Sequence, residues 1–169
     1  MRTRRARPPD LRAIQALISH YAAQGLLLPR SEDDIRAHLG AFLVLAEKEK
    51  VLGCVALENY GAGLAEIRSL AVAPNAQGRW LGPRLVRCAL AEARRRKMAR
   101  VFAVTRAPAL FRREGFALTT RFAVPEKIQR DCRACPKHSH CDLVALVAVV
   151  IPERIVLPVL DAAASPAGA

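Results

Sequence analysis

One segment constrains the fold of this chain more than any other: an apolar strand whose pattern changes phase, then a loop of small residues and a strongly amphipathic helix. In the predicted strand 64–73, Glu66 and Arg68 share one face, and the alternation shifts near Ser69, as it does at a β-bulge. The helix that follows carries an apolar stripe of Leu81, Leu85, Val86, Ala89, Leu90 and Ala93. This order predicts a sheet with a long helix packed on it.

Further strands and helices flank that segment. Apolar spacing predicts a helix capped by Asp10 and a second, short helix capped by Ser31. The other predicted strands are 2–7, 41–46, 51–57, 101–104, 116–120 and 143–151, the last buried on both faces, with a short helix at 108–114. The order predicts an α/β (α+β) fold with a mixed, mostly antiparallel sheet and helices on both faces.

Length and composition favour one folded domain. The 169 residues are 52% hydrophobic and 25% charged, which argues against disorder. We expect the domain to span residues 1–151, followed by a disordered tail over 152–169, which is rich in Ala and Pro. The longest apolar run, 143–151, is shorter than the about 20 residues of a membrane span. No apolar segment follows the basic N-terminus, so we expect a cytoplasmic location without membrane contact.

The chain is strongly basic, with a formal net charge of +12. Such a surplus indicates an anionic partner: a nucleic acid, a membrane surface or a polyphosphate ligand. Aromatic residues make up only 5% and do not alternate with basic ones, which argues against stacking on single-stranded nucleic acid. An arginine-rich coding bias is the alternative explanation of the charge.

The loop before the long helix, Gln77-Gly78-Arg79-Trp80-Leu81-Gly82, is a candidate site for such a polyphosphate. The first N–H groups of a helix lack partners within it, and the helix dipole is positive at that end. Backbone N–H groups of the loop and helix start would therefore converge on an anion, and a diphosphate suits that geometry. The alternative is an ordinary strand-to-helix turn.

These segments together resemble the GCN5-related N-acetyltransferase (GNAT) superfamily over most of residues 2–123. Its pyrophosphate-binding signature is Gln/Arg-x-x-Gly-x-Gly/Ala, and residues 77–82 match it except at Trp80, where glycine is usual. Residues 109–116 resemble the family's late helix and Gly-Phe turn, with Phe111 where many members carry a tyrosine that serves as general acid. The resemblance implies a three-layer fold splayed at the bulge. It also implies acetyl-CoA as co-substrate, bound by Leu70, Ala71, Val72, Gln77, Gly78, Arg79, Trp80, Leu81 and Gly82.

Within the superfamily the chain resembles the short bacterial N-acetylglutamate synthases, through residues 24–31, 66–72, 105–111 and 127–135. This implies direct transfer of the acetyl group of acetyl-CoA to the α-amino group of L-glutamate in a ternary complex, the first step of arginine biosynthesis. One alternative is acetyl transfer to another small amine or a protein N-terminus. An alternative of another class is a zinc-dependent nucleic-acid-binding module. The oligomeric state stays open, with a homodimer as one option.

The resemblance also implies roles for individual side chains. The acceptor amine is mostly protonated at pH 7 and needs a base. Glu66 is the candidate, acting directly or through a water, and an ion pair with Arg68 is its structural alternative. Ser69 is the other candidate catalytic residue and also a candidate contact to substrate. Arg30 and Arg106 are candidates for binding the acceptor's two carboxylates, because guanidinium groups bind carboxylates in a bidentate fashion. The alternative for each is a solvated surface arginine.

A cluster of cysteine and histidine follows residue 131. Cys132, Cys135, Cys141 and His140 are candidate ligands of a structural zinc ion in a Cys3His tetrahedron. The alternatives are a reduced structural cluster or a labile thiol pair. Five cysteines, an odd number, argue against a disulfide framework. Cys54 and Cys88 fall in apolar patterns and are predicted to lie in the core.

Overall fold

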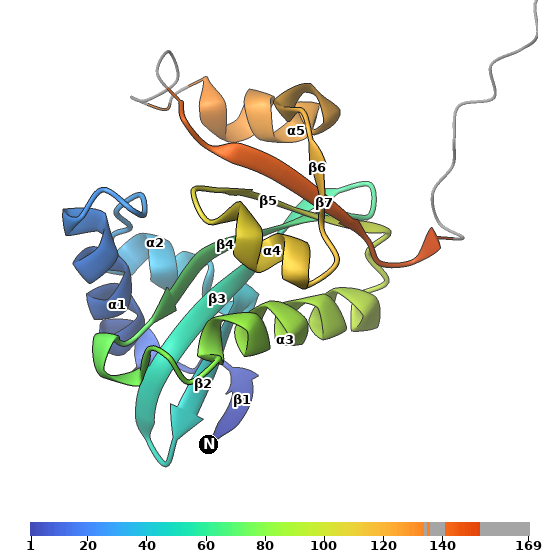
Figure 1. Cartoon of the computed structure of the whole chain (residues 1–169). Coiled ribbons are helices and arrows are strands. Elements are labelled where there is room, and N and C mark those ends of the chain that lie inside the picture. Colours follow the sequence, from blue (N-terminus) through green and yellow to red (C-terminus); the bar gives the residue numbers. More distant parts are fainter. Residues whose placement is uncertain (134, 136–140, 153–169) are drawn as a thin grey trace, which may run out of the picture.

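A single sheet runs through the computed structural model, which describes residues 1–133, 135 and 141–152. Within these residues the sheet has seven strands in the order β1-β2-β3-β4-β5-β7-β6 (Figure 1). The strands are β1 Arg2–Arg5, β2 Phe42–Glu47, β3 Lys50–Gly61, β4 Leu64–Val72, β5 Arg100–Thr105, β6 Ala117–Thr119 and β7 Val144–Val149. Strand β4 pairs with β5 in parallel, and the other described neighbours pair antiparallel. The predicted mixed, mostly antiparallel sheet is therefore confirmed.

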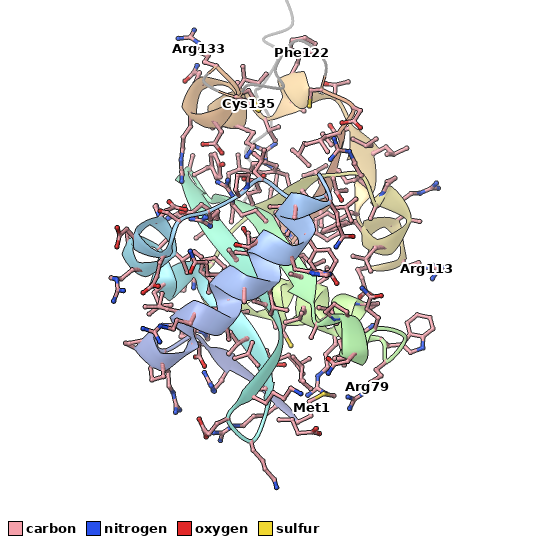
Figure 2. The ribbon with its side chains drawn as sticks, turned by 90° about the vertical axis from the view of Figure 1, so that its left-hand side faces the viewer. Met1, Arg79, Arg113, Phe122, Arg133 and Cys135 are labelled. Atoms are coloured by element: carbon pink, nitrogen blue, oxygen red, sulfur yellow. The ribbon has the colours of Figure 1, made fainter. Side chains whose placement is uncertain are left out.

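Helices cover both faces of this sheet. The longer ones are α1 Leu11–Ala23, α2 Glu32–Ala37, α3 Leu81–Arg95 and α4 Pro108–Arg113, and α5 Pro125–Lys127 continues into a π-helical turn, η5, at Ile128–Cys132. Short 3-10 turns occupy Pro8–Asp10, Leu39–Ala41, Pro74–Ala76 and Arg121–Ala123. Helices α1 and α3 both pack on β3 and β4 from opposite sides, with α1 in front of the sheet in Figure 2 and α3 behind it. No described helix is long and apolar enough to cross a membrane.

The apolar stripes seen in the sequence form the core. Leu11, Ile14, Leu17 and Ile18 of α1 are buried, as are the six predicted residues of α3. Each helix thus buries one face against the sheet, and a fully buried aliphatic side chain of this size contributes about 1.5–3 kcal/mol. Gly25, with φ of 71°, follows the C-cap of α1, and Ser31 caps α2 by accepting from the Asp34 N–H.

Two local predictions differ from the structure. Asp10 lies at the N-cap of α1 but does not bond to its N–H groups; its carboxylate accepts from Arg4 and from the Arg7 N–H instead. Strand β7 is not buried on both faces, because Val149 is 50% exposed near the end of the sheet. Residues 125–132, for which the sequence pattern predicts no regular element, form α5 and η5. The predicted tail, from residue 153 on, lies outside the described residues.

The predicted bulge lies in β4 at Ser69. Arg68 pairs with Ala56, but Ala71 pairs with Cys54, so β4 contains one residue more than β3 over this stretch. Ser69 takes up the extra length with φ of 52°. Opposite the bulge, β3 has Gly53, where an added Cβ would come within 2.9 Å of the Ala71 carbonyl oxygen. A larger residue at this position would push the bulge out of place.

Candidate active site

The sheet opens between β4 and β5. These strands pair only at Leu64–Arg100, Ala65–Val101 and Glu66–Phe102, although β4 continues to Val72 and β5 to Thr105. Beyond Glu66 the two strands diverge, and the bulge lies in the divergent part. Backbone groups along the facing edges are thereby available to an extended ligand between the strands, as expected for a sheet splayed at a bulge.

A cavity of about 370 Å³ lies at one end of this opening, at the start of α3. It is lined by Val72, Gln77, Gly78, Trp80, Leu81, Gly82 and Pro83. Six of the nine predicted coenzyme-binding residues are therefore together. Of the other three, Leu70 and Ala71 lie at the bulge, and Arg79 is exposed beside the cavity (Figure 2).

The loop is shaped for close approach to its backbone. Gly78 has φ of 74°, and an added Cβ there would meet nothing within 4 Å among the described residues, so this turn is open on that side. The Arg84 N–H bonds back to the Trp80 carbonyl, which leaves the N–H groups before it at the open end of α3. Pro83 has no N–H, which removes one donor from this set. The arrangement suits an anion such as a diphosphate.

Tyr21 of α1 links this loop to β4. Its hydroxyl donates to the Val72 carbonyl and accepts from Gln77 Nε2 at 2.7 Å. Gln77, the first residue of the family signature, thus orients the loop through Tyr21. No local sequence pattern marks Tyr21 for this role, because Tyr21 and Gln77 are 56 positions apart.

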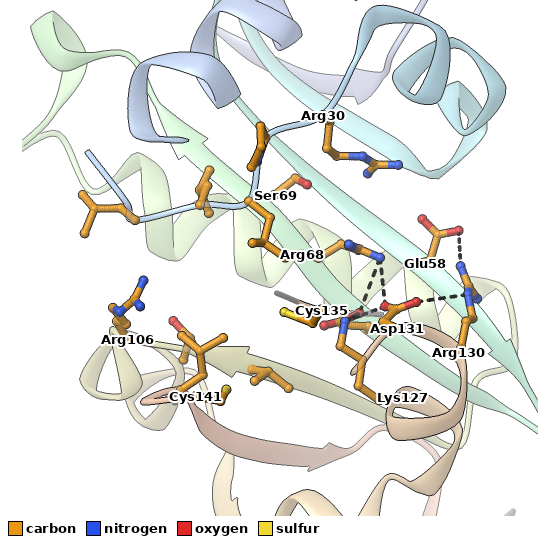
Figure 3. A pocket seen from close by; sticks show the side chains of 18 of the residues that line it. Arg30, Glu58, Arg68, Ser69, Arg106, Lys127, Arg130, Asp131, Cys135 and Cys141 are labelled. Carbon is orange, nitrogen blue, oxygen red and sulfur yellow. Dashed lines mark hydrogen bonds and ion pairs between the residues drawn. The ribbon is translucent and has the colours of Figure 1, made fainter. Parts of the chain in front are cut away.

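A larger cavity of about 570 Å³ lies on the α1 side of the opening (Figure 3). Its walls come from the loop between α1 and α2, from β4, from the β5–α4 connection and from α5, η5 and the segment before β7. Glu66, Ser69, Arg30 and Arg106, the predicted catalytic and acceptor-binding residues, all line it. We refer to it below as the acceptor cavity.

Glu66 is buried at this cavity, with its side chain 3% exposed, and belongs to a network. Its Oε2 lies 2.7 Å from the Tyr60 hydroxyl and 2.9 Å from Lys127 Nζ. The same two groups contact Asp131 Oδ2, at 2.6 Å and 2.7 Å. The expected alternative partner, Arg68, is 4.0 Å away and bonds to Asp131 at 3.3 Å. Glu66 is therefore held by Tyr60 and Lys127 more closely than by Arg68.

This network balances its charges. Glu58 of β3 lies directly opposite Glu66 of β4. Arg130 of η5 forms an ion pair with Glu58 at 3.2 Å. Burial raises the pKa of Asp131, but hydrogen bonds from Lys127 and Tyr60 outweigh it, and the net pKa is lowered. Burial and the two neighbouring carboxylates raise the pKa of Tyr60, so its hydroxyl stays protonated. Three acidic side chains (Glu58, Glu66 and Asp131) and three basic ones (Arg68, Lys127 and Arg130) thus surround Tyr60.

Burial lowers the pKa of Arg68, but the carboxylates of Glu66 and Asp131 raise it more, and the net pKa lies above the ordinary value. Arg68 therefore stays cationic at the cavity wall. The sequence pattern marks Arg68 only as a possible partner for Glu66 and does not single out Tyr60, Lys127 or Asp131. These come from elements more than 60 residues apart in sequence, and only the family-like stretch 127–135 pointed to the last two.

Arg30 enters the acceptor cavity from the loop before α2. Its Nε donates to Asp34 and lowers the pKa of that carboxyl, and its guanidinium lies 5.3 Å from the centre of the Phe42 ring. The side chain is only 7% exposed, and Nη1 is buried with no hydrogen-bond partner among the described residues. A buried donor without a partner marks a place where a ligand can complete the bonding.

Arg106 enters the cavity from the β5–α4 connection (Figure 3). It holds Asp142 in a bidentate pair at 2.8 Å and 2.7 Å, and its Nη1 donates to the Gly25 carbonyl at 2.6 Å. Arg106 therefore ties the loop after α1 to the segment before β7. Both predicted acceptor-binding arginines therefore line one cavity, Arg30 with a largely buried side chain and Arg106 as an exposed residue paired with Asp142.

Two further positions concern the predicted catalysis: Ser69, a candidate catalytic residue, and Phe111, which replaces the tyrosine of many GNAT members. Ser69, at the bulge, lines the acceptor cavity, and its carbonyl accepts from the Cys54 thiol at 3.6 Å. Phe111 is buried in α4 and packs edge to face on Phe116 at 5.3 Å. Position 111 thus supplies packing and no phenolic proton.

The described cysteines do not form the predicted zinc site. Cys132, Cys135 and Cys141 are free thiols, and Cys135 and Cys141 line the acceptor cavity. No group of three His, Cys, Asp or Glu side chains among the described residues is arranged to hold a metal ion. His140, the fourth predicted ligand, lies outside the described residues. Of the predicted core cysteines, Cys54 is buried, which raises the pKa of its thiol to about 12, while Cys88 is only partly buried.

Comparisons with known proteins agree with this geometry. The model of the acetyltransferase (GNAT) family matches residues 10–116. An uncharacterized N-acetyltransferase of Chlorobaculum tepidum is 38% identical over 144 residues, which cover 85% of this chain and 93% of that protein. An amino-acid acetyltransferase of Neisseria meningitidis is 34% identical over 139 residues, 81% of this chain. The matched region is only 32% of the Neisseria protein.

A solved structure is also similar over most of the chain. The N-acetylglutamate synthase of Neisseria gonorrhoeae, complexed with coenzyme A and N-acetyl-glutamate, has a TM-score of 0.80 and 30% identity. The match covers 88% of this chain and 35% of that one, so this chain corresponds to about a third of the synthase. The resemblance inferred from the sequence is confirmed, and the chain belongs to the GNAT acetyltransferase family.

Proposed function

We propose that the chain transfers the acetyl group of acetyl-CoA to the α-amino group of L-glutamate, as the first step of arginine biosynthesis. The observation that carries this proposal is the acceptor cavity, which Arg30 and Arg106 both line and where Arg30 Nη1 is buried with no partner among the described residues. Two guanidinium groups suit an acceptor with two carboxylates. The similarity to an N-acetylglutamate synthase complexed with coenzyme A and N-acetyl-glutamate supports the same substrates.

The proposed site for the coenzyme is the 370 Å³ cavity at the start of α3. The open turn at Gly78 and the N-terminus of α3 offer N–H groups to its pyrophosphate, with Arg79 exposed beside them. Backbone groups of Leu70 and Val72 lie along the divergent edge of β4, where they would bind the pantetheine and polarise the thioester carbonyl. When bound, acetyl-CoA supplies the acyl group, and the chain's part is to hold it against the acceptor.

Glu66 is the proposed base. Its carboxylate lies at the acceptor cavity on the last residue of β4 that pairs with β5, where the coenzyme slot begins. The acceptor nitrogen loses two protons as the amide forms, and the leaving thiolate takes up one, so one proton leaves per turnover. Tyr60 and Lys127 bond to Oε2 of Glu66, and neither of these bonds uses Oε1. Because Phe111 offers no proton, we assign protonation of the thiolate to solvent or to the Ser69 hydroxyl.

The two arginines have different parts in acceptor binding. Arg30 Nη1 would receive one acceptor carboxylate without losing its bond to Asp34. Arg106 would exchange Asp142 for the other carboxylate, since the Asp142 side chain is 60% exposed and can turn into solvent. Membership of an acetyltransferase family favours this enzyme over the nucleic-acid-binding module considered from the sequence.

The test is the release of free thiol from acetyl-CoA with L-glutamate, L-aspartate, L-glutamine and L-alanine as acceptors. We expect turnover with glutamate above the other three. A hydrogen bond to a charged group contributes about 1.5–3 kcal/mol, so Arg30→Ala should raise the KM for glutamate about 10- to 100-fold with little change for acetyl-CoA. Arg113→Ala, an exposed arginine on α4 (Figure 2), is the matched control and should change neither.

Two results would contradict the proposal. Equal turnover with alanine and glutamate would mean that the arginines do not select a second carboxylate. Preferential turnover of a different amine would leave the family and the coenzyme site intact but replace the acceptor, in favour of the small-amine or protein N-terminus alternative.

A further inference from the structure

Trp80 is an unusual residue for its place in the chain. It is the only tryptophan, and it occupies the position of the phosphate-loop signature at which glycine is usual. Its backbone has φ of 58° and ψ of 25°, the left-handed region that a bulky side chain rarely adopts. Its side chain is nevertheless 67% exposed, so burial in the core does not explain why a tryptophan stands there.

The surroundings of Trp80 point to a ligand. The residue lines the 370 Å³ cavity together with the open turn at Gly78 and the first turn of α3. A large aromatic surface thus adjoins a group of backbone N–H donors, with the guanidinium of Arg79 next in sequence. A flat ring beside an anion-binding turn matches a ligand that joins a flat heterocycle to a diphosphate.

We propose that Trp80 stacks on the adenine ring of the coenzyme and sets the preference of this enzyme for the full adenine nucleotide. This inference rests on the coenzyme site of the proposed function, but not on the identity of the acceptor. The slot between β4 and β5 takes the pantetheine, and the start of α3 takes the pyrophosphate. The adenosine then lies on the solvent side of the loop, where the exposed face of Trp80 is available.

The experiment uses Trp80 as its own reporter, because it is the only tryptophan. Titration of the full chain with coenzyme A, with no acceptor present, should change the tryptophan fluorescence with a saturable dependence on concentration. Stacking of a base on an aromatic side chain strengthens binding by about tenfold or more. Trp80→Gly should therefore raise the Kd for coenzyme A, measured by calorimetry, about tenfold, whereas Trp80→Phe should keep most of the affinity.

The control is a donor that lacks the adenosine. Wild type and Trp80→Gly should have the same Kd for S-acetyl-pantetheine 4′-phosphate, measured by calorimetry, because the ring has nothing to stack on. A loss of the same size for both donors would overturn the proposal, since it would mean that the substitution deforms the loop. An unchanged Kd for coenzyme A in Trp80→Gly, or binding without any fluorescence change in the wild type, would also overturn it.

These outcomes are distinct from failure of the glutamate assignment. If coenzyme A binds and reports through Trp80 while glutamate is not acetylated, the stacking stands and the acceptor is wrong. If calorimetry detects no binding of coenzyme A to the wild-type chain, the coenzyme site fails and the stacking fails with it.

Discussion

Glu92, near the end of α3, offers a sharp test of how the sheet is held to that helix. Its carboxylate accepts from Arg5 of β1 at 2.8 Å, from Arg95 at 2.6 Å and from Arg96 at 2.7 Å. Burial alone would raise the pKa of Glu92, but these hydrogen bonds outweigh it and bring the pKa from 4.5 to about 2. The substitution Glu92→Gln keeps the shape of this side chain and removes its negative charge.

The size of the pKa shift of Glu92 gives the contribution of its charge to the free energy of unfolding. One pKa unit corresponds to about 1.4 kcal/mol, so the full shift corresponds to about 3 kcal/mol of stability. Arg5 and Arg95 are more than half exposed, and solvent screening reduces the value to about 2 kcal/mol. Because the folded-state pKa of Glu92 is the lower one, this stability is present above pH 4.5 and is lost as the pH falls toward 2.

Urea unfolding of the wild type and Glu92→Gln at several pH values measures this effect. We expect a difference of about 2 kcal/mol at pH 7 that shrinks steadily below pH 4.5. Glu32→Gln is the matched control, because Glu32 has an exposed pair with Arg36 on α2 and should change stability by less than about 1 kcal/mol. A pH-independent difference, or one as small as that of the control, would show that the charge of Glu92 does not hold β1 to α3.

Three further predictions concern the site. Gly53→Ala should destabilise the fold by about 1–3 kcal/mol in urea unfolding, because the new methyl would lie 2.9 Å from the Ala71 carbonyl oxygen; an unchanged midpoint would show that the bulge can shift freely. Trp80→Gly should stabilise the coenzyme-free chain by about 1 kcal/mol, a rise in Tm of about 2–4 °C, by relieving the left-handed backbone; a lower Tm would contradict this. Lys127→Met should lower kcat about tenfold, because Glu66 loses the ammonium group that holds its Oε2 at the acceptor cavity; an unchanged kcat would show that Lys127 does not position Glu66.

Regular elements could be predicted because their signals are local. The α3 stripe, the bulge near Ser69 and the cap at Ser31 each follow from a few neighbouring residues. The strand β7 was misjudged at Val149, because the exposure of a strand depends on what covers its end of the sheet. Sequence periodicity carries no information about that covering.

The site divides in the same way. Glu66, Arg30 and Arg106 could be proposed because they fall in family-like stretches, whereas Tyr21 and Tyr60 could not. Each of those tyrosines acts through a hydroxyl that meets partners from distant segments, 51 and 71 positions away for Val72 and Asp131. Side chains that hold other functional groups in place are visible only once the chain has folded.

The pair between Arg106 and Asp142 has a consequence for selectivity. Asp142 already gives Arg106 the two-pronged contact that an acceptor carboxylate would give, at 2.8 Å and 2.7 Å. In the proposed acceptor complex, an incoming carboxylate would therefore exchange one ion pair for another of nearly equal strength, and the exchange itself would contribute little net affinity. Discrimination at this arginine then depends on the fit of the incoming group between Arg106 and the opposite wall, and only weakly on its charge. The resident aspartate acts as an internal competitor that small anions in the cell must also displace.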